Sequence, residues 1–130
     1  MLAKVSAFQT EEGVVSELEE LRNAIRRFAD ERDWNQFHSP KNLAMALIVE
    51  AGELVEQFQW LKQSESHDLP LEKFEAVEEE LADIFVYLIR IADKLDINIV
   101  KAAQKKIRLN ESKYPVEIVR GKAKKYTEYQ

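Results

Sequence analysis

The sequence contains no cysteine, so a disulfide framework and a thiolate metal site are both excluded. It has only three glycines and three prolines in 130 residues, which argues against a sheet with many turns and favours an all-α protein. No stretch reaches the roughly 18 uninterrupted apolar residues of a membrane span, and the first residues lack the apolar segment of a signal peptide. We therefore expect a cytoplasmic protein without a membrane partner, with residues 1–130 forming one domain.

Positive charge is scarce in most of the chain. Lysine and arginine total 19 against 24 acidic residues, which gives a formal net charge of −5. The first 100 residues carry ten basic and 21 acidic groups, whereas Lys101 and the residues after it carry nine basic and three acidic groups. Because affinity for nucleic acid depends on neutralising phosphates with basic side chains, we expect no nucleic-acid polymer as a partner.

Apolar periodicity and capping signals predict four helices in a four-helix-bundle-like arrangement. A capping box begins at Ser16, Ser39 followed by Pro40 is a favoured helix start, and Asn98 can cap the last helix. The predicted helices span about residues 17–33, 40–62, 71–95 and 99–114.

The segments between and around these helices have their own signals. Residues 1–13 are expected to form a loose N-terminal arm, residues 63–70 a turn-rich loop, and residues 116–130 a basic C-terminal tail without strong periodicity. Gly52 lies inside the second predicted helix, where glycine costs about 1 kcal/mol relative to alanine. We interpret Gly52 as a point of close approach to another element.

The third predicted helix is apolar on most sides between Asp83 and Ala92. A helix of this kind is buried on most sides, and a small domain has difficulty covering it with its own chain. The pattern therefore predicts a homo-oligomer, either a dimer or a tetramer.

Two acidic pairs interrupt the most apolar segments of the chain. Glu50 and Glu53 lie within LAMALIVEAGELVEQFQWL, and Glu80 and Asp83 lie within EEELADIFVYLIRIADKL. Helical spacing places each pair on one face, and burial of four unpaired carboxylates is tolerable only if cations neutralise them. The alternative interpretation of any one pair is a solvated helix face.

Four carboxylates without a neighbouring histidine or cysteine would form an all-oxygen site, which favours Mg²⁺, with Mn²⁺ as a substitute, over zinc or copper. Magnesium held in this way usually keeps positions open for water and substrate phosphates. The pattern therefore indicates chemistry on a phosphate ester or anhydride. The alternative from another functional class is a non-catalytic interaction module. In such a protein the acids would pair with lysine or arginine across a subunit interface.

Residues outside the acidic pairs could hold the rest of a nucleotide. Lys106, Asn110 and Lys113 share a helical face and could contact phosphates, although each lysine could equally be a solvated side chain. The rings of Trp34, Phe37, Trp60 and Tyr87 could stack on a base, although core packing is the commoner role of a helical aromatic residue. Trp60 is the strongest candidate, because helical spacing places it on the same stripe as Glu50 and Glu53. His38 is either a contact to the base or an exposed loop residue.

The segments RDWNQFHSP, EAGELVEQFQW, EEELADIFVYL and LNESKYP together resemble the MazG-like all-α nucleoside triphosphate pyrophosphohydrolases, and most closely their dCTP pyrophosphatase branch. The resemblance runs from about Leu18 to the terminal KYTEY. The family pattern is E-x-x-E, a spacer and E-x-x-D, and here 26 residues separate the two pairs. Where many members carry two adjacent glutamates at the start of the first motif, this chain has Val49 before Glu50.

The resemblance implies Mg²⁺-dependent hydrolysis of a nucleoside triphosphate to the monophosphate and pyrophosphate, as a step that cleans the nucleotide pool. It also implies a helical dimer or dimer of dimers with sites at subunit interfaces. By motif position it assigns metal ligands and catalytic residues (Glu50, Glu53, Glu80, Asp83), base-pocket residues (Trp34, His38, Trp60) and phosphate or sugar contacts (Lys106, Asn110, Lys113, Tyr114). We expect dCTP or a 5-substituted dCTP as substrate, with dUTP, phosphoribosyl-ATP or another nucleotide as the alternative.

Overall fold

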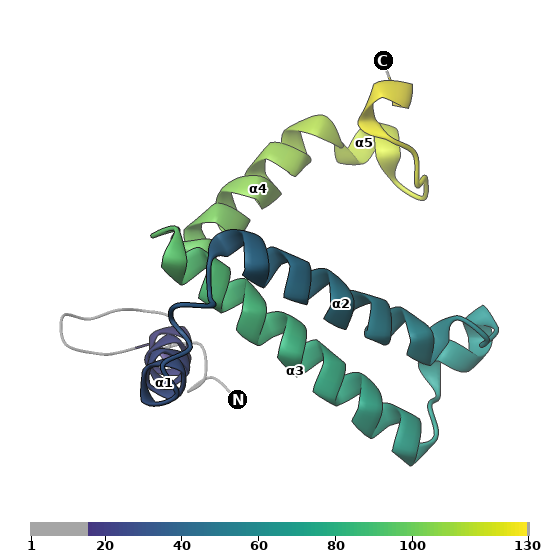
Figure 1. The fold of residues 1–130 in the computed structure, drawn as a ribbon. Coiled ribbons are helices and arrows are strands. Elements are labelled where there is room, and N and C mark those ends of the chain that lie inside the picture. The colour runs from purple at the N-terminus through teal and green to yellow at the C-terminus, as the bar shows by residue number, and fades with distance from the viewer. Residues whose placement is uncertain (1–15, 130) are drawn as a thin grey trace. The chain divides into compact units, whose positions relative to one another are not determined.

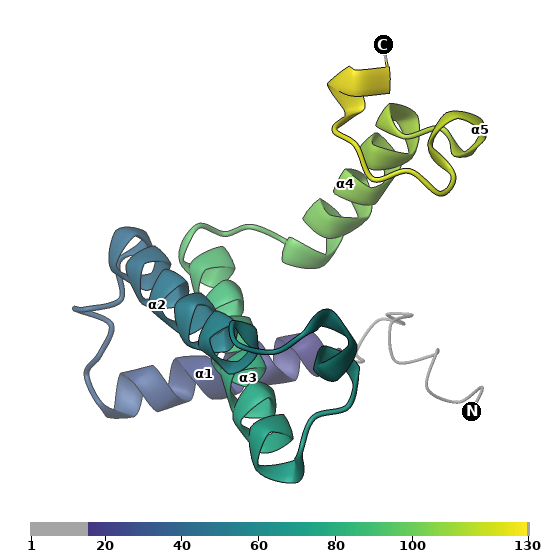
Figure 2. The same ribbon diagram turned by 90° about the vertical axis from the view of Figure 1, so that its right-hand side faces the viewer.

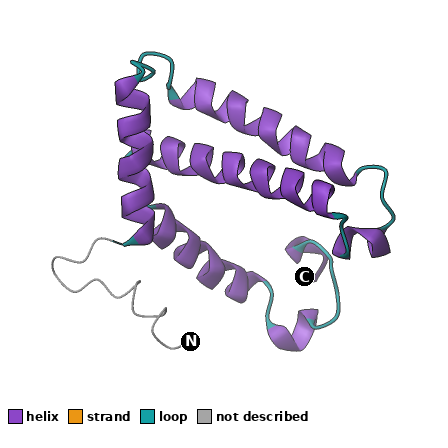
Figure 3. Cartoon of the chain, turned by 90° about the horizontal axis from the view of Figure 1, so that it is seen from below, coloured by secondary structure: helices purple, strands orange, loops and turns teal. Residues whose placement is uncertain are grey.

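The computed structural model describes residues 16–129, so the predicted N-terminal arm at 1–13 lies outside the described residues. This part of the chain contains helices and loops and no strand, which confirms the predicted all-α class (Figure 3). The elements are α1 (Glu17–Glu31), α2 (Pro40–Phe58), the 3₁₀ helix η2 (Gln63–His67), α3 (Leu71–Lys94), α4 (Ile99–Lys113), α5 (Val116–Val119) and the 3₁₀ helix η3 (Tyr126–Tyr129). Within residues 16–129, none of the helices is both long enough and apolar enough to cross a membrane.

The three predicted helix starts are confirmed by side-chain caps. Ser16 Oγ accepts a hydrogen bond from the Glu19 backbone N–H at 3.2 Å, and Ser39 Oγ accepts one from Asn42 at 3.1 Å. Asn98 Oδ1 caps α4 in the same way, at 3.1 Å from the Lys101 nitrogen. Each cap satisfies a backbone donor that has no partner within its own helix, which explains why the helices begin where they do.

The predicted end of the second helix near residue 62 is wrong, because α2 stops at Phe58. The Leu61 N–H bonds to the Phe58 carbonyl at 2.9 Å, and the Glu65 carboxylate accepts the Lys62 N–H at 2.9 Å. These two bonds turn the chain away from the helix axis and begin η2. The segment predicted as a simple loop at 63–70 therefore includes a short 3₁₀ helix, Gln63–His67.

The described residues form two compact units, one up to Asp96 and one from Ile97. In the first unit, α2 and α3 lie side by side in opposite directions, and α1 runs across them and packs against α3 (Figures 1 and 2). The buried apolar side chains are few, and they lie on all three helices: Ala29, Leu43, Ile89 and Ala92. The core of this unit is therefore the seam where α1, the start of α2 and the end of α3 meet.

The second unit contains α4, α5 and η3. Its C-terminal tail, predicted without strong periodicity, folds back so that the rings of Tyr126 and Tyr129 meet the Tyr114 ring edge-on, with centroids 6.5 and 6.2 Å away. The Lys113 ammonium lies 4.8 Å from the centre of the Tyr126 ring. These contacts order the tail against the end of α4. That residues 1–130 form one domain stays a prediction.

One face of α2 carries large apolar side chains that the described chain leaves in solvent. Met45, Ile48, Val49 and Val55 are between 57 and 69% exposed. Gly52 lies among them, and a Cβ placed on it would have nothing within 4 Å. The close approach predicted at Gly52 is therefore not made within the described chain. The result is an apolar strip, which we call the α2 strip, with a small residue at its centre.

A buried arginine ties α3 to the neighbouring elements. Arg90 is only 4% exposed, and its guanidinium lies 3.7 Å from the Asp93 carboxylate. Arg26 of α1 donates two hydrogen bonds to the same carboxylate. The hydrogen-bonded Arg26 guanidinium lowers the pKa of Asp93 below its ordinary value. Asp93 therefore joins two arginines, one buried and one half-exposed.

We expect Asp93→Asn to lower the free energy of unfolding by about 1–3 kcal/mol at pH 7, because it leaves the buried Arg90 charge without its carboxylate. The stabilisation by Asp93 is complete above the pKa of an unfolded aspartate, about 3.9, and is lost as the pH falls through the lower folded pKa. Urea unfolding at pH 7 and pH 3 should therefore show a difference that closes in acid. Glu75→Gln, an exposed neutralisation on the same helix, is the control. Equal stability of the Asp93 variant and the parent at pH 7 would contradict this account.

Candidate functional site

Three carboxylates from two helices converge near the middle of the α2–α3 pair. Glu50 of α2 and Glu80 and Asp83 of α3 can each place one oxygen so that all three lie within 4.8 Å of one another. The convergence follows from the antiparallel packing, which sets the centre of α2 beside the centre of α3. Residues 30 positions apart in the sequence thus form one group of hard oxygen donors, hereafter the acidic cluster.

Glu53, the fourth predicted ligand, lies one helical turn after Glu50. Its pKa is raised above the ordinary value, first because it can share a proton with the Glu50 carboxyl and then through the charge of that group. Glu53 therefore neighbours Glu50 but stands outside the group of three oxygens. The structure brings together three of the four predicted acids and places the fourth beside them.

The acidic cluster is electrostatically unfavourable without a cation. The pKa of Glu50 is raised, first because it can share a proton with the Glu80 carboxyl and also because burial and the charge of Asp83 disfavour its ionised form. Glu50 Oε2 and Glu80 Oε2 are buried and have no hydrogen-bond partner in the described part of the chain. Between residues 16 and 129, no basic side chain forms an ion pair with these acids. Hard oxygen atoms without partners fit a bound Mg²⁺ or Mn²⁺ ion.

The acids are less buried than the sequence suggested. Glu50, Glu53 and Glu80 are half-buried and Asp83 is exposed, whereas the apolar segments around them predicted a site in the interior. The physical reason is that only α2 and α3 contribute to the cluster, so its open side is reached by solvent. A metal at this position would keep access to water and to a ligand.

Tyr87 stands one turn beyond Asp83 on α3 and is half-buried. Burial raises the pKa of its phenol, and the charges of Glu50 and Asp83 raise it further. Tyr87 therefore stays protonated at neutral pH and offers an O–H donor beside the acidic cluster.

The structure brings two predicted base-pocket residues together on the connector between α1 and α2. The His38 and Trp34 rings meet edge-on with centroids 6.1 Å apart, and Trp34 meets Phe28 of α1 at 5.5 Å. Arg90 Nε donates a hydrogen bond to His38 Nδ1 at 3.3 Å. His38 is thereby attached to the C-terminal part of α3 and is not a free loop side chain.

Trp60 lies at the opposite end of the α2–α3 pair. It follows the end of α2 and is 86% exposed, so it does not continue the helical stripe of Glu50 and Glu53 as predicted. At this end Lys73 Nζ donates to the Gln57 carbonyl at 3.0 Å.

The 17 residues of α3 between Lys73 and Arg90 correspond to about 25 Å of helix. His38 is bound to Arg90 at one end of this span, whereas Trp60 follows the end of α2 at the other. Within one chain, a single base therefore cannot contact both His38 and Trp60.

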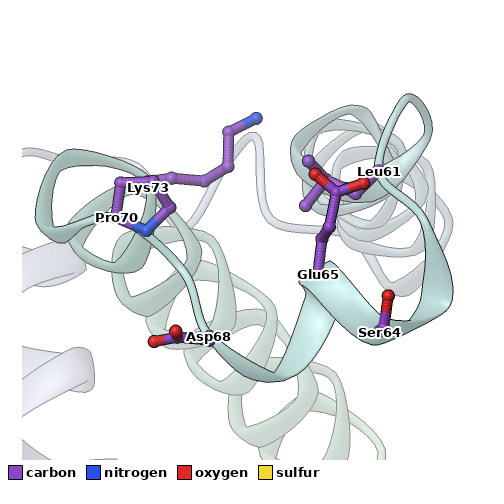
Figure 4. A pocket seen from close by; sticks show the side chains of 6 residues that line it. All are labelled: Leu61, Ser64, Glu65, Asp68, Pro70 and Lys73. Carbon is purple, nitrogen blue, oxygen red and sulfur yellow. The ribbon is translucent and has the colours of Figure 1, made fainter.

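An open cavity of about 390 Å³ lies at the Trp60 end, between the end of α2, η2 and the start of α3 (Figure 4). The side chains of Glu65 and Lys73 lie on opposite sides of it, and Leu61, Ser64, Asp68 and Pro70 also line it. None of the four predicted metal ligands lines it. The acidic cluster is thus a surface site on the helix pair and not part of this cavity.

The predicted phosphate and sugar contacts all lie in the second unit. Lys106, Asn110 and Lys113 are exposed on α4, and their spacing places them on one helical face as expected. Tyr114 caps α4 and packs against the tail. These residues and the acidic cluster belong to different units, and their meeting in one site stays a prediction.

Two residues with a clear structural role were not singled out from the sequence. Arg90 Nη2 and Lys94 Nζ both donate to Asn35 Oδ1, and Asn35 in turn donates to Asp30. The signal for Arg90 was present, because it is the one basic residue inside the apolar run of α3 and a buried guanidinium needs several acceptors. Asn35 carried no such signal, since a polar residue in a connector is usually solvated.

Known proteins resemble this chain in sequence and in fold. The dCTP pyrophosphatase 1 proteins of Mus musculus and Homo sapiens are 42% and 40% identical to it over 113 and 114 residues, which is 85% of this chain and 66% of each relative. The chain therefore spans just under two thirds of the length of these relatives. The crystal structure of a pyrophosphatase from Archaeoglobus fulgidus superposes with a TM-score of 0.70 and 38% identity, covering 82% of this chain and 99% of that one.

Residues 45–129, which include the acidic cluster and parts of both units, match the MazG-like family. This match covers more than half of the chain, and the resemblance inferred from the acidic pairs and their flanking motifs is confirmed. The chain belongs to the MazG-like family.

Proposed function

We propose that this protein is a Mg²⁺-dependent nucleoside triphosphate pyrophosphohydrolase that acts in the cytoplasm and cleans the nucleotide pool. The observation that carries the proposal is the acidic cluster: within residues 16–129, two of its buried carboxylate oxygens have no hydrogen-bond partner and none of its acids has an ion pair with a basic side chain. The pyrophosphatase names of the relatives at about 40% identity support the same reaction class. The reaction adds one water to a phosphoanhydride and yields the monophosphate and pyrophosphate.

In this proposal Glu50, Glu80 and Asp83 hold the metal, and Glu53 is the fourth predicted ligand. Bound Mg²⁺ supplies positive charge that offsets the repulsion between the acidic cluster and a triphosphate. A carboxylate oxygen that does not bind the metal would accept the proton of the attacking water. The protonated Tyr87 phenol can donate a hydrogen bond to a phosphate or sugar oxygen beside the cluster.

We propose dCTP or a 5-substituted dCTP as the substrate, on the strength of the relatives named dCTP pyrophosphatase 1. Trp34, His38 and Trp60 would contact the base. Lys106, Asn110, Lys113 and Tyr114 would contact the phosphates or sugar. The alternative is that this chain, like a related enzyme of the same superfamily, acts on another nucleotide such as dUTP.

We further propose that the protein is a homo-oligomer, a dimer or dimer of dimers, whose sites combine residues of two copies. Two observations support this. His38 and Trp60 lie at opposite ends of the α2–α3 pair, so a base that contacts both needs them from different chains. The α2 strip around Gly52 offers an open apolar face with room for the backbone of another helix.

Substitution of a metal ligand tests the acidic cluster. We expect Glu80→Gln to reduce magnesium-dependent turnover about 100-fold or more and to abolish the rise in melting temperature on addition of Mg²⁺. The same substitution should raise the melting temperature of the metal-free protein, because it removes one of three crowded negative charges. Turnover and thermal unfolding with Mg²⁺ and with chelator measure these effects.

Glu79→Gln, at the neighbouring exposed position of α3, is the matched control and should behave as the parent. If Mg²⁺ leaves the melting temperature of the parent unchanged and a chelator leaves its activity unchanged, the acidic cluster is not a metal site. The interaction-module alternative would then be favoured, because it predicts stability that is indifferent to Mg²⁺.

Pyrophosphate release from dCTP, 5-methyl-dCTP, dUTP, dTTP, dATP and dGTP tests the substrate. We expect magnesium-dependent release that is concentrated on the two cytosine nucleotides. Equal release from dUTP would reject the cytosine assignment while leaving the reaction class intact. Absence of release from every nucleotide would reject the proposed reaction for these substrates.

Mixing two inactive variants tests the shared site. His38→Ala and Trp60→Ala should each lower activity alone. After subunit exchange, a mixture should recover about a quarter of parental activity, because half of the dimers are mixed and each has one site with both residues intact. A mixture that is no more active than its components would place each site within one chain.

Light scattering on Ile48→Glu, compared with the exposed control Gln59→Glu, would show whether the α2 strip forms the interface.

A further inference from the structure

The most constrained polar group outside the acidic cluster is the Arg90 guanidinium. It is almost fully buried, and its nitrogens are shared between three partners: Nε donates to His38 Nδ1 at 3.3 Å, Nη2 donates to Asn35 Oδ1, and Nη1 lies 3.7 Å from Asp93. Arg26 holds Asp93 from its other side. The position of the guanidinium is therefore defined by contacts in several directions.

This arrangement determines which nitrogen of His38 carries a proton. A guanidinium has only donors and does not lose its proton in proteins, so the His38 Nδ1 atom that faces Arg90 Nε must be an unprotonated acceptor. A neutral imidazole then carries its single proton on Nε2. That nitrogen has no partner between residues 16 and 129 and is not among the buried unpartnered atoms, so solvent reaches it.

The charges around His38 favour the same state. Burial lowers the pKa of its imidazole, and the positive charges of Arg90 and Lys94 on α3 lower it further. The connector contributes Trp34 and Asn35, which carry no charge. Within residues 16–129, both charged groups that shift the pKa of His38 are cations, and the lowered pKa leaves His38 uncharged at neutral pH.

We propose that Arg90 is a positioning residue that holds His38 as a permanent, uncharged Nε2–H donor, and that this donor recognises the ring nitrogen acceptor of a cytosine base. The ligand class in this inference rests on the proposed function. An uncharged donor suits a neutral heterocycle better than a phosphate, which prefers cations. Cytosine presents an acceptor at N3, whereas uracil and thymine carry a proton there, so a fixed donor discriminates between them.

The location of His38 fits this role. Arg90 follows Asp83 by seven residues on α3, which corresponds to about 10 Å along the helix. The Trp34 ring beside His38 supplies an apolar surface next to the donor. A donor at this distance from the acidic cluster suits the base of a nucleotide whose phosphates lie at the metal.

The tautomer can be observed directly, because the chain contains only two histidines. We expect ¹⁵N NMR of the full-length, ligand-free protein to show His38 as the neutral Nε2–H form at pH 7, with a pKa below the ordinary value near 6.5. His67, exposed on η2 at the other end of the helix pair, is the internal control and should show a mixture of tautomers. Addition of dCMP with Mg²⁺ should shift the His38 Nε2 resonance and leave His67 unchanged.

Arg90→Met tests the positioning role. We expect His38 to lose its single tautomer and its pKa to rise, while KM for dCTP rises about five- to tenfold and kcat changes less than about twofold. Arg26→Met is the matched control, because it removes the other arginine on Asp93 without touching His38. It should lower stability but leave the His38 tautomer, its pKa and KM unchanged.

Several outcomes would overturn the proposal. A parental His38 that is protonated on Nδ1 or charged at pH 7 would do so, as would a resonance that dCMP does not move. These measurements need no turnover, so they stand even if Arg90→Met fails to fold. Conversely, a protein that shows the expected tautomer and responds to dCMP but hydrolyses no nucleotide would contradict the proposed function and retain the Arg90 assignment.

Discussion

Repulsion among the carboxylates of Glu50, Glu80 and Asp83 is the constraint on which the rest of the structure depends. Packing α2 against α3 places these groups within reach of one another, and without a cation this arrangement opposes the packing. The helices must therefore be held together by contacts elsewhere. Those contacts lie at the two ends of the pair, where Arg90 reaches the connector before α2 and Lys73 bonds to the end of α2.

The two ends differ in strength and in consequence. At the Arg90 end, α1 adds an ion pair, and the buried apolar side chains of α1, α2 and α3 meet, so this is the most closely packed part of the first unit. At the Lys73 end, the contacts are a single hydrogen bond and the turn around η2, and an open cavity remains. A ligand contact at His38 would thus be set by a firmly packed network, whereas Trp60 projects from the less constrained end.

A single chain leaves much of this arrangement open. The α2 strip is exposed, a Cβ on Gly52 would meet nothing within 4 Å among the described residues, and the predicted base-pocket residues are divided between distant ends. In an isolated subunit the exposed apolar α2 strip favours association. The separated base-pocket residues cannot contact one base within a single chain. A second copy would resolve both, which is why the proposed oligomer and the proposed site are one hypothesis.

Local sequence patterns are sufficient to predict the helical class, the helix starts and the acidic pairs. These are local properties: caps at Ser16, Ser39 and Asn98 act within four residues, and i, i+3 spacing places each acidic pair on one face. Only the tertiary structure decided which acids meet, that α2 ends at Phe58, that Trp60 is remote from His38, and that Arg90 sets the proton of His38. These facts depend on contacts between residues that are distant in sequence, such as Arg90 with His38, and no local pattern encodes such a pairing.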